Sequence, residues 1–211
     1  MASPTGLSTK QLRLLGRLSE IPALKEFYLA GGSALGWYFG HRRSADLDLF
    51  SVSAESSLGL AVAALTKQGA QVQAETDVAV NLETGGVPVD LVRYPYPPLN
   101  PPKVGPSGFP VASLVDLGAM KLAAIARRGL RRDFWDLHVL LTDGRLALPA
   151  LVKAYAKRYR RSASDSYHVA RALTFFEDAE RDDPRVLGLS EKRWAEMKRF
   201  FEERASALML H

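Results

Sequence analysis

Cysteine is absent from this chain of 211 residues. Its absence excludes disulfide bonds, catalytic thiolates, cysteine-ligated zinc and iron–sulfur clusters. Also missing is any apolar run long enough to cross a bilayer as a helix. Residues 1–6 lack the charged region and apolar core that begin a signal peptide. We therefore expect a cytoplasmic protein with no membrane partner.

Neither sign of charge is in large excess, because the formal net charge is only +5. A modest positive charge suits an anionic partner such as a nucleotide or RNA, although many basic proteins bind neither. At 47% apolar and 24% charged residues, the composition is that of an ordinary globular protein. The length allows one large domain or two small ones, and a monomer is the default expectation.

The two halves of the chain differ in their hydrophobic patterns. The first half alternates short apolar runs with helical patterns, which predicts strands at 27–30, 47–52, 71–74, 79–82 and 87–93 and helices at 8–18, 33–39 and 58–68. Residues 94–110 are rich in proline and glycine, which indicates a linker or an ordered crossover. Helical patterns then follow at 111–128, 131–141, 149–159, 164–176 and 190–208. The sequence predicts an α+β domain at 1–105 and a helical domain at 106–211.

Two aspartates, Asp46 and Asp48, alternate along a short apolar run. Residues two apart in a strand point to the same face, so both carboxylates should project together. Two like charges held that close raise each other's pKa unless a cation lies between them. Mg²⁺ is the natural cation, because it binds carboxylate and phosphate oxygens together. The pair favours phosphoryl or nucleotidyl transfer, with an exposed alternating strand as the plainer alternative.

A third aspartate and a glycine turn accompany the pair. Asp90 lies inside an apolar strand pattern, where a buried carboxylate must be paired or bound to a metal. An edge-strand residue facing water is the alternative. Upstream, Gly31, Gly32 and Ser33 join a strand to a helix, where close backbone approach and the free N–H groups of the helix favour a phosphate. Ser33 can also serve as a helix cap alone.

Together these motifs resemble those of the AbiEii/AbiGii toxin-type nucleotidyltransferases of bacterial abortive-infection and toxin–antitoxin systems. That family is part of the polymerase-β-like nucleotidyltransferase superfamily. The resemblance covers roughly residues 27–141 and is carried by 27–35, 41–50, 89–91, Lys121 and 131–137. It implies a polymerase-β-like N-terminal domain with a mixed sheet and helices, followed by an α-helical lobe.

The resemblance implies a Mg²⁺-dependent enzyme that transfers NMP from an NTP to an acceptor hydroxyl. Asp46, Asp48 and Asp90 would hold one or two Mg²⁺ ions as metal-binding and catalytic residues. Asp90 could also accept the proton of the attacking hydroxyl. Gly32 and Ser33 would bind the β- and γ-phosphates.

Three further residues are expected to bind the nucleotide. Arg43 would contact phosphate or orient the carboxylates, although its charge also suits the end of a helix. Lys121, on an otherwise apolar helix, would reach the triphosphate as a point charge and act in catalysis. Its alternative is a side chain that extends to solvent. Asp136 shares a helix face with Asp133, and we interpret both as positioning groups for Lys121 or the arginines.

The resemblance favours RNA, with tRNA as the leading form, as the acceptor, and a cognate antitoxin protein as a partner. Basic residues at 127–132 could receive RNA phosphates, and the stretch 155–161 interleaves tyrosine with arginine. The plainer interpretation is a solvated loop between helices for 127–132 and an amphipathic helix with a solvated side for 155–161. Two alternatives stay open: transfer to a protein or a small, antibiotic-like molecule, and a non-catalytic nucleotide-binding module.

Overall fold

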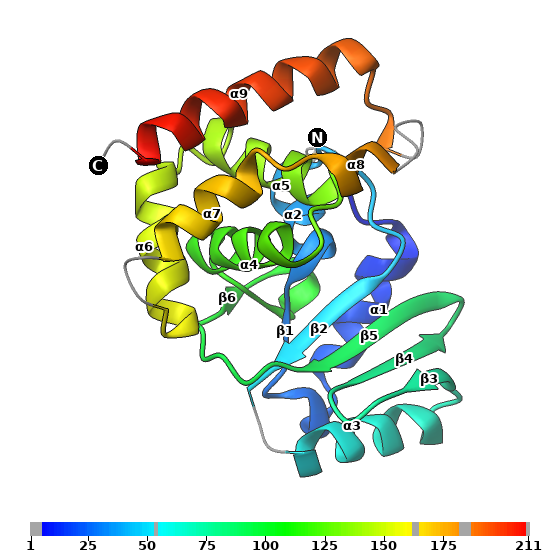
Figure 1. Ribbon diagram of the computed structural model, residues 1–211. Coiled ribbons are helices and arrows are strands. Elements are labelled where there is room, and N and C mark those ends of the chain that lie inside the picture. Colours follow the sequence, from blue (N-terminus) through cyan, green and yellow to red (C-terminus); the bar gives the residue numbers. More distant parts are fainter. Residues whose placement is uncertain (1–5, 53–54, 162–164, 182–186, 210–211) are drawn as a thin grey trace. The chain divides into compact units, whose positions relative to one another are not determined.

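The computed structural model describes residues 6–52, 55–161, 165–181 and 187–209 of the chain (Figure 1). The chain divides into two compact units, Met1–Ser113 and Leu114–His211. The division into an α+β domain at 1–105 and a helical domain at 106–211 stays a prediction. Among the helices that the structure describes, none is long and apolar enough to cross a membrane.

A seven-stranded mixed sheet with the order β3-β4-β5-β2-β1-β7-β6 forms the first unit. Its strands are β1 (Tyr28–Leu29), β2 (Leu47–Ser51), β3 (Gln71–Glu75), β4 (Ala79–Thr84), β5 (Val87–Arg93), β6 (Lys103–Val104) and β7 (Pro110–Val111). Strand β2 runs parallel to β5, and β1 runs parallel to β7, whereas the other neighbours are antiparallel. The predicted combination of a mixed sheet with helices is confirmed.

The register of the two central strands determines where the acidic residues lie. Asp48 of β2 is the partner of Asp90 of β5. Partners in neighbouring strands point their side chains to the same face of the sheet. Along β2, Leu47, Leu49 and Ser51 are buried, while Asp48 is half-buried. The apolar side chains therefore fix the strand in the core and turn the carboxylates to the opposite face.

The helices of this unit are α1 (Thr9–Ser19), α2 (Gly31–Phe39) and α3 (Glu55–Lys67), with 3₁₀ turns η1 (Pro22–Leu24) and η2 (Pro106–Gly108). Helix α1 begins with a capping box. The Ser8 hydroxyl accepts from the Gln11 N–H at 3.3 Å, and the Gln11 amide oxygen accepts from the Ser8 N–H at 2.8 Å. Leu14, Leu15 and Leu18 then bury one face of the helix.

Residues 94–110, expected as a linker or an ordered crossover, contribute short strands to the sheet. They contain β6 and begin β7. Val111 of β7 pairs with Leu29 of β1, and the Tyr38 hydroxyl donates to the carbonyl oxygen of Ala112 at 3.1 Å. The linker interpretation is therefore wrong for this segment. The sequence did not indicate these strands because two residues are too few to produce a hydrophobic period.

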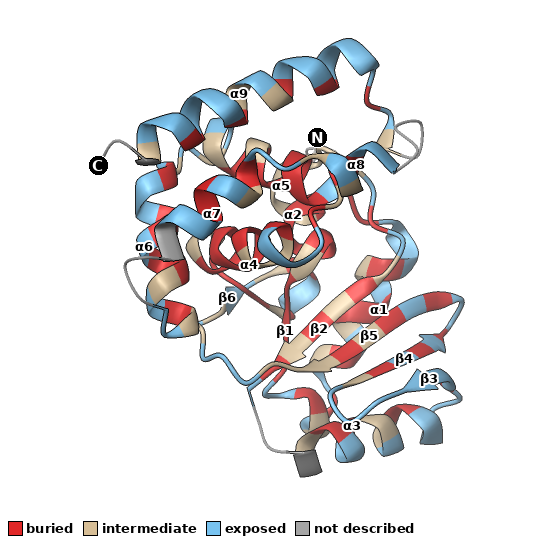
Figure 2. Cartoon of the chain, in the orientation of Figure 1, coloured by how far each residue is buried: buried red, intermediate tan, exposed pale blue. Residues whose placement is uncertain are grey.

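The second unit contains helices α4 (Leu114–Arg127), α5 (Arg131–Thr142), α6 (Leu148–Tyr159), α7 (Asp165–Leu173), α8 (Glu177–Arg181) and α9 (Glu191–Met209). Each was predicted within a few residues except α8, whose five residues are too few for a helical pattern. Figure 2 shows buried and exposed residues alternating along these helices. The aromatic core includes Phe134, whose ring centroid lies 5.4 Å from that of Phe201 and 6.0 Å from that of Trp194.

Two arginines are buried in the second unit and hold its helices together. Arg158 of α6 pairs with Asp116 of α4, and both side chains are fully buried. Arg131 of α5 donates from Nε to the carbonyl oxygen of Ala179 at 3.1 Å. Its guanidinium also lies 4.7 Å from the ring centroid of Trp194. The packing of this unit thus depends on buried charge as well as on apolar contacts.

We expect Arg158→Met to lower the free energy of unfolding by about 3–5 kcal/mol, because it leaves the buried Asp116 carboxylate without its cation. The double variant Asp116→Leu/Arg158→Met should lose less, since neither charge then stays buried. Urea denaturation measures both. The exposed neighbour Lys157→Met is the control, and an equal loss in that variant would contradict the prediction.

Candidate active site

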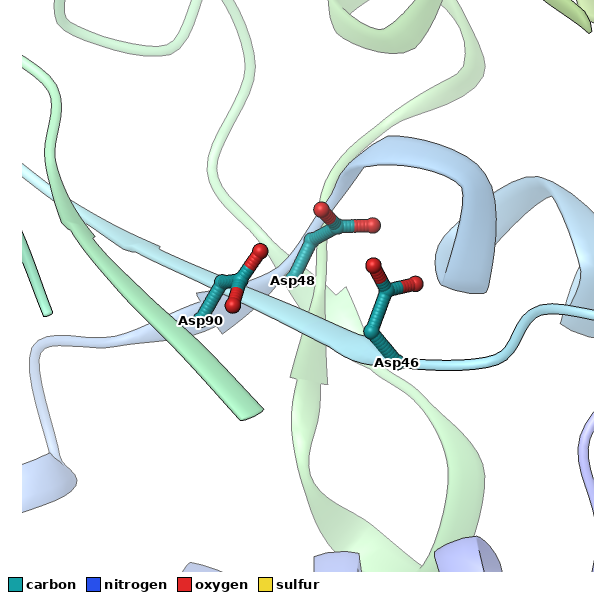
Figure 3. A group of neighbouring side chains, drawn as sticks. All are labelled: Asp46, Asp48 and Asp90. Atoms are coloured by element: carbon teal, nitrogen blue, oxygen red, sulfur yellow. The ribbon is translucent and has the colours of Figure 1, made fainter. Parts of the chain in front are cut away.

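Three carboxylates meet on one face of the sheet. Asp46, Asp48 and Asp90 each offer an oxygen, and these oxygens all lie within 4.8 Å of one another. Figure 3 shows the three side chains projecting from the same side of their strands. All three residues are half-buried. In the part of the chain that the structure describes, this is the one group of three or more histidine or acidic side chains so arranged.

Asp48 caps helix α2 from the neighbouring strand. Its Oδ2 accepts from the N–H groups of Gly32 at 3.1 Å and Ser33 at 3.4 Å, and from the Ser33 hydroxyl at 3.2 Å. The Ser33 hydroxyl oxygen accepts in turn from the N–H of Asp48 at 3.0 Å. The helix has no side-chain cap from its own N-cap residue, Ala30. An anion is favoured at this helix end, and here Asp48 supplies it.

Gly31 makes this close approach sterically feasible. Its φ of +56° is a left-handed conformation that glycine adopts readily. A Cβ atom at this position would lie 2.3 Å from Oδ2 of Asp48. Both the backbone conformation and the lack of space therefore require glycine at residue 31.

Of the two neighbouring arginines, Arg42 lies against the glycine turn. A Cβ atom on Gly32 would meet an Nη atom of Arg42 at 2.3 Å. Nη1 of Arg42 also donates to the carbonyl oxygen of Arg43 at 3.3 Å. Arg43 itself is exposed. The structure therefore places Arg42 next to a predicted phosphate-binding residue, and the role of Arg43 stays a prediction.

Asp46 precedes strand β2, and hydrogen bonds from the side chains of Ser44 and Gln11 hold it in place. The Ser44 hydroxyl donates to Asp46 Oδ1 at 3.1 Å. The buried Gln11 side chain donates from Nε2 to the carbonyl oxygens of Ser44 at 3.1 Å and Asp46 at 3.4 Å. The capping-box spacing signals the start of α1, but nothing in the sequence indicates that Gln11 also reaches this loop.

Asp90 is held by Asn81, its partner in strand β4. Nδ2 of Asn81 donates to Asp90 Oδ1 at 2.7 Å. Burial raises the pKa of Asp90 and the charge of Asp46 raises it further, whereas the Asn81 hydrogen bond opposes this shift. Asn81 was not predicted as a site residue, because only the strand register identifies it as a neighbour of Asp90.

In the second unit, Lys121 of α4 is held by two carboxylates of α5. Its Nζ lies 2.8 Å from Oδ2 of Asp136 and 3.0 Å from Oδ1 of Asp133. Burial by itself would lower the pKa of Lys121, but the charges of Asp136 and Asp133 outweigh it, and the pKa is raised. Arg128 also pairs with Asp133, at 3.0 Å. Lys121 is therefore held in its charged form.

The two basic stretches considered for RNA are partly buried. In 127–132, Arg131 is only 2% exposed. In 155–161, Tyr155 and Arg158 are 9% and 3% exposed. These three side chains pack inside the helical unit, so they do not belong to an exposed basic surface, and RNA binding by the remaining residues of the two stretches stays a prediction.

Comparison with known proteins shows which family and which solved structures this chain resembles. The model of a family described as the nucleotidyl transferase AbiEii toxin of a type IV toxin–antitoxin system matches residues 59–207. An uncharacterized protein of Aquifex aeolicus (strain VF5) is 31% identical over 203 residues, which cover 94% of this chain and 95% of that protein. A crystal structure of a candidate nucleotidyltransferase from H. pylori superimposes with a TM-score of 0.52 at 18% identity, covering 96% of this chain and 98% of that one.

A second crystal structure, of JHP933 from Helicobacter pylori, gives a TM-score of 0.51 at 18% identity and covers 96% of this chain and 95% of that one. These two likenesses show a shared fold. The family match includes Asp90, Lys121, Asp133 and Asp136. It begins after the glycine turn and after Asp46 and Asp48, so the geometry of the structure connects these residues to Asp90.

We expect Gly31→Ala to lower the free energy of unfolding by at least about 1–2 kcal/mol, the cost of left-handed φ in a residue with a Cβ atom. The added methyl group must also displace Asp48. Gly59→Ala is the matched control, because residue 59 lies in helix α3 with open space around it. It should be neutral or stabilising by up to about 1 kcal/mol. Similar losses in the two variants, measured by urea denaturation, would refute the steric argument.

The acid stability of the protein should depend on Asp133. Burial raises its pKa, but Lys121 and Arg128 outweigh this effect and the pKa is lowered overall. A lowered folded-state pKa means that the ionised group stabilises the protein fully above the unfolded value of about 3.9, and that this contribution is lost as pH falls through the folded value.

We therefore expect the stability difference between the native chain and Asp133→Asn to be largest near neutral pH and to shrink below about pH 4. Urea denaturation between pH 7 and pH 3 measures it, with the exposed Asp143→Asn as the control. A difference that stays constant or grows as pH falls would contradict the assignment.

Proposed function

The chain belongs to the AbiEii nucleotidyl transferase toxin family, and we propose that it transfers NMP from an NTP to a hydroxyl group of RNA in a Mg²⁺-dependent reaction. Family membership agrees with the predicted family, fold and enzyme class. The observation that carries the proposal is the group formed by Asp46, Asp48 and Asp90. We propose tRNA as the leading acceptor.

The carboxylates form a donor set that fits Mg²⁺. Oxygens bound to one octahedral Mg²⁺ at about 2.1 Å lie roughly 3–4 Å apart, and the three aspartates offer oxygens within 4.8 Å of one another. Small rotations of these side chains would close the remaining gap. When bound, Mg²⁺ would neutralise triphosphate charge and lower the pKa of the attacking hydroxyl.

In the proposed reaction the hydroxyl oxygen forms a bond to the α-phosphorus of the NTP. The bond from that phosphorus to the oxygen bridging to the β-phosphate breaks, and pyrophosphate leaves. Asp90, the strand partner of Asp48 beside the cation site, accepts the hydroxyl proton. Asp46 and Asp48 hold the cation, and the fixed positions of these groups supply much of the acceleration.

Gly32 and Ser33 are the proposed donors to the β- and γ-phosphates. Their N–H groups already bind Oδ2 of Asp48. A phosphate needs the same donors, so Asp48 must turn away from the helix and toward the other two carboxylates. The repulsion that this creates is relieved by a cation. Nucleotide binding and cation binding are therefore coupled through Asp48.

In the same proposal, Lys121 binds the triphosphate as a point charge and takes part in catalysis. Asp136 acts through Lys121, which it contacts at 2.8 Å. Arg43, exposed just before the first carboxylate, contacts phosphate. These three assignments rest on the family motif and on charge.

The proposal extends to a biological role. The matching family is described as the toxin of a type IV toxin–antitoxin system. We propose that this chain is a toxin-like component of such an abortive-infection system, that it acts in the cytoplasm, and that a cognate antitoxin is its partner. An RNA acceptor suits a chain with a net charge of +5.

The deciding experiment incubates the purified protein with Mg²⁺, total bacterial RNA and each of the four α-labelled NTPs. We expect label in a tRNA-sized band. Asp46→Asn/Asp48→Asn should lose on the order of 100-fold or more of the activity, because the charge stabilisation at the reacting phosphate is lost. The exposed pair Glu75→Gln/Asp77→Asn, which removes two negative charges from the same unit, should keep it.

Label on the protein itself would replace the RNA acceptor by a protein. Absence of labelled RNA with all four NTPs would overturn the RNA proposal. Transfer to an added aminoglycoside would then identify a small-molecule acceptor. Binding of NTP without Mg²⁺ that survives Asp46→Asn would instead favour a non-catalytic module.

A further inference from the structure

We propose that the exposed basic surface of helices α6 and α7 binds the sugar–phosphate backbone of the RNA acceptor. This surface, the α6–α7 basic face, consists of Lys153, Lys157, Arg160, Arg161, Tyr167 and Arg171. The inference rests on the proposed function, because it takes RNA as the acceptor. It keeps Lys157, Arg160 and Arg161 of the stretch 155–161 and leaves out Tyr155 and Arg158, which are buried.

Positive charge is concentrated in this part of the sequence. Between residues 144 and 176 the chain has one acidic residue, Asp165, and seven basic ones: Arg145, Lys153, Lys157, Arg158, Arg160, Arg161 and Arg171. The net charge of this segment is therefore +6, against +5 for the whole chain. A field of one sign attracts polyanions and steers them to the surface.

The packing of α6 turns its lysines outward. Leu151, Tyr155 and Arg158 are buried on one side of the helix. Lys153 and Lys157, four residues apart, are exposed and share one face of the helix. The ion pair of Arg158 with Asp116 fixes the rotation of α6, because both side chains are fully buried.

The end of α6 adds two arginines to the α6–α7 basic face. Arg160 has a left-handed conformation, with a φ of 52° and a ψ of 45°, and its N–H donates to the carbonyl oxygen of Ala156. Arg160 and Arg161 are both exposed. Two adjacent exposed cations, Arg160 and Arg161, therefore stand at the C-terminal end of α6.

Helix α7 adds an aromatic ring and a further cation. Val169, Ala170 and Leu173 are buried, whereas Arg171 is exposed and Tyr167 is 55% exposed. Helices α6 and α7 are in contact. The chain from Arg161 to Tyr167 spans six residues, which limits their separation to about 20 Å. An exposed tyrosine near a row of cations suits an unpaired base that stacks while its phosphates bind lysine and arginine.

The composition of the face favours RNA over an acidic protein or an anionic membrane. A protein interface needs an apolar, largely uncharged centre, and a membrane-bound helix needs an apolar face toward the lipid. Among the described residues of α6 and α7, Tyr167 is the one exposed large hydrophobic side chain, and Phe175, two residues after α7, is a second, at 50% exposure. The face therefore lacks the apolar area that either alternative requires.

The test measures binding of fluorescently labelled bacterial tRNA by anisotropy at several salt concentrations. Lys153→Gln/Lys157→Gln should weaken binding about 10-fold and reduce the slope of log K against log salt by about 1.4–1.8, since two phosphate contacts are lost. Lys192→Gln/Arg199→Gln removes two exposed charges from α9 of the same unit and should change the affinity less than about 2-fold.

Tyr167→Ala provides a second, independent signature. We expect a loss of about 5-fold or more in affinity with an unchanged salt slope, because stacking is lost and no charge is removed. Thermal denaturation of each variant checks that it is folded. Equal losses in the α6 and α9 pairs would overturn the proposal, as would binding of a polyglutamate peptide or anionic vesicles that depends on this face while tRNA binding does not.

The same variants separate this inference from the proposed activity. Asp46→Asn/Asp48→Asn should bind tRNA normally while losing label transfer. If the native chain transfers no label to RNA but the α6 pair still weakens tRNA binding selectively, the proposed activity fails and the basic face stands. If the native chain transfers label to RNA and Lys153→Gln/Lys157→Gln binds tRNA as the native chain does, the proposed RNA-binding role of the α6–α7 basic face is wrong and the proposed activity stands.

Discussion

Repulsion among three carboxylates is the constraint on which the first unit depends. Two unit charges 4 Å apart repel by about 4 kcal/mol at an effective dielectric constant of 20, and three such groups lie within 4.8 Å of one another here. Neutral donors limit this cost: Ser33 binds Asp48, Ser44 binds Asp46, and Asn81 binds Asp90. Each donor comes from a different element, so the sheet register, the glycine turn and the loop before β2 must all form before the carboxylates are held.

In the second unit, the buried acidic side chains are paired with basic side chains. Lys121 and Arg128 compensate Asp133 and Asp136 over 2.8–3.0 Å, and Arg158 compensates Asp116. Buried ion pairs of this kind orient helices, and breaking one costs far more than forming it gains. At the half-buried Asp46, Asp48 and Asp90, neutral groups donate hydrogen bonds to the carboxylates. In the second unit, Asp133 and Asp136 hold the ammonium group of Lys121 in place.

The sequence predicted the strands and the three aspartates well, because a period of two in an apolar run is a local signal. It could not identify Gln11 or Asn81, since their contacts depend on the packing of α1 against a loop and on the register of β4 with β5. Nor could it distinguish Arg42 from Arg43 beside the turn. Strands β6 and β7, with two residues each, and helix α8, with five, are too short to repeat a hydrophobic period. In the basic stretches, composition predicted charge correctly but could not tell Arg131 and Arg158, which are buried, from their exposed neighbours.

The contact between Gly31 and Asp48 also bears on how such a sequence can change over generations. Residue 31 has no room for a side chain, and residue 48 must be a short acid to fit against it. We expect these two positions to vary together or not at all. The surrounding donors are under a weaker constraint, since a hydroxyl and an amide can exchange roles as hydrogen-bond donors. Divergence in this fold should therefore accumulate first at Gln11, Ser44 and Asn81, and last at Gly31 and Asp48.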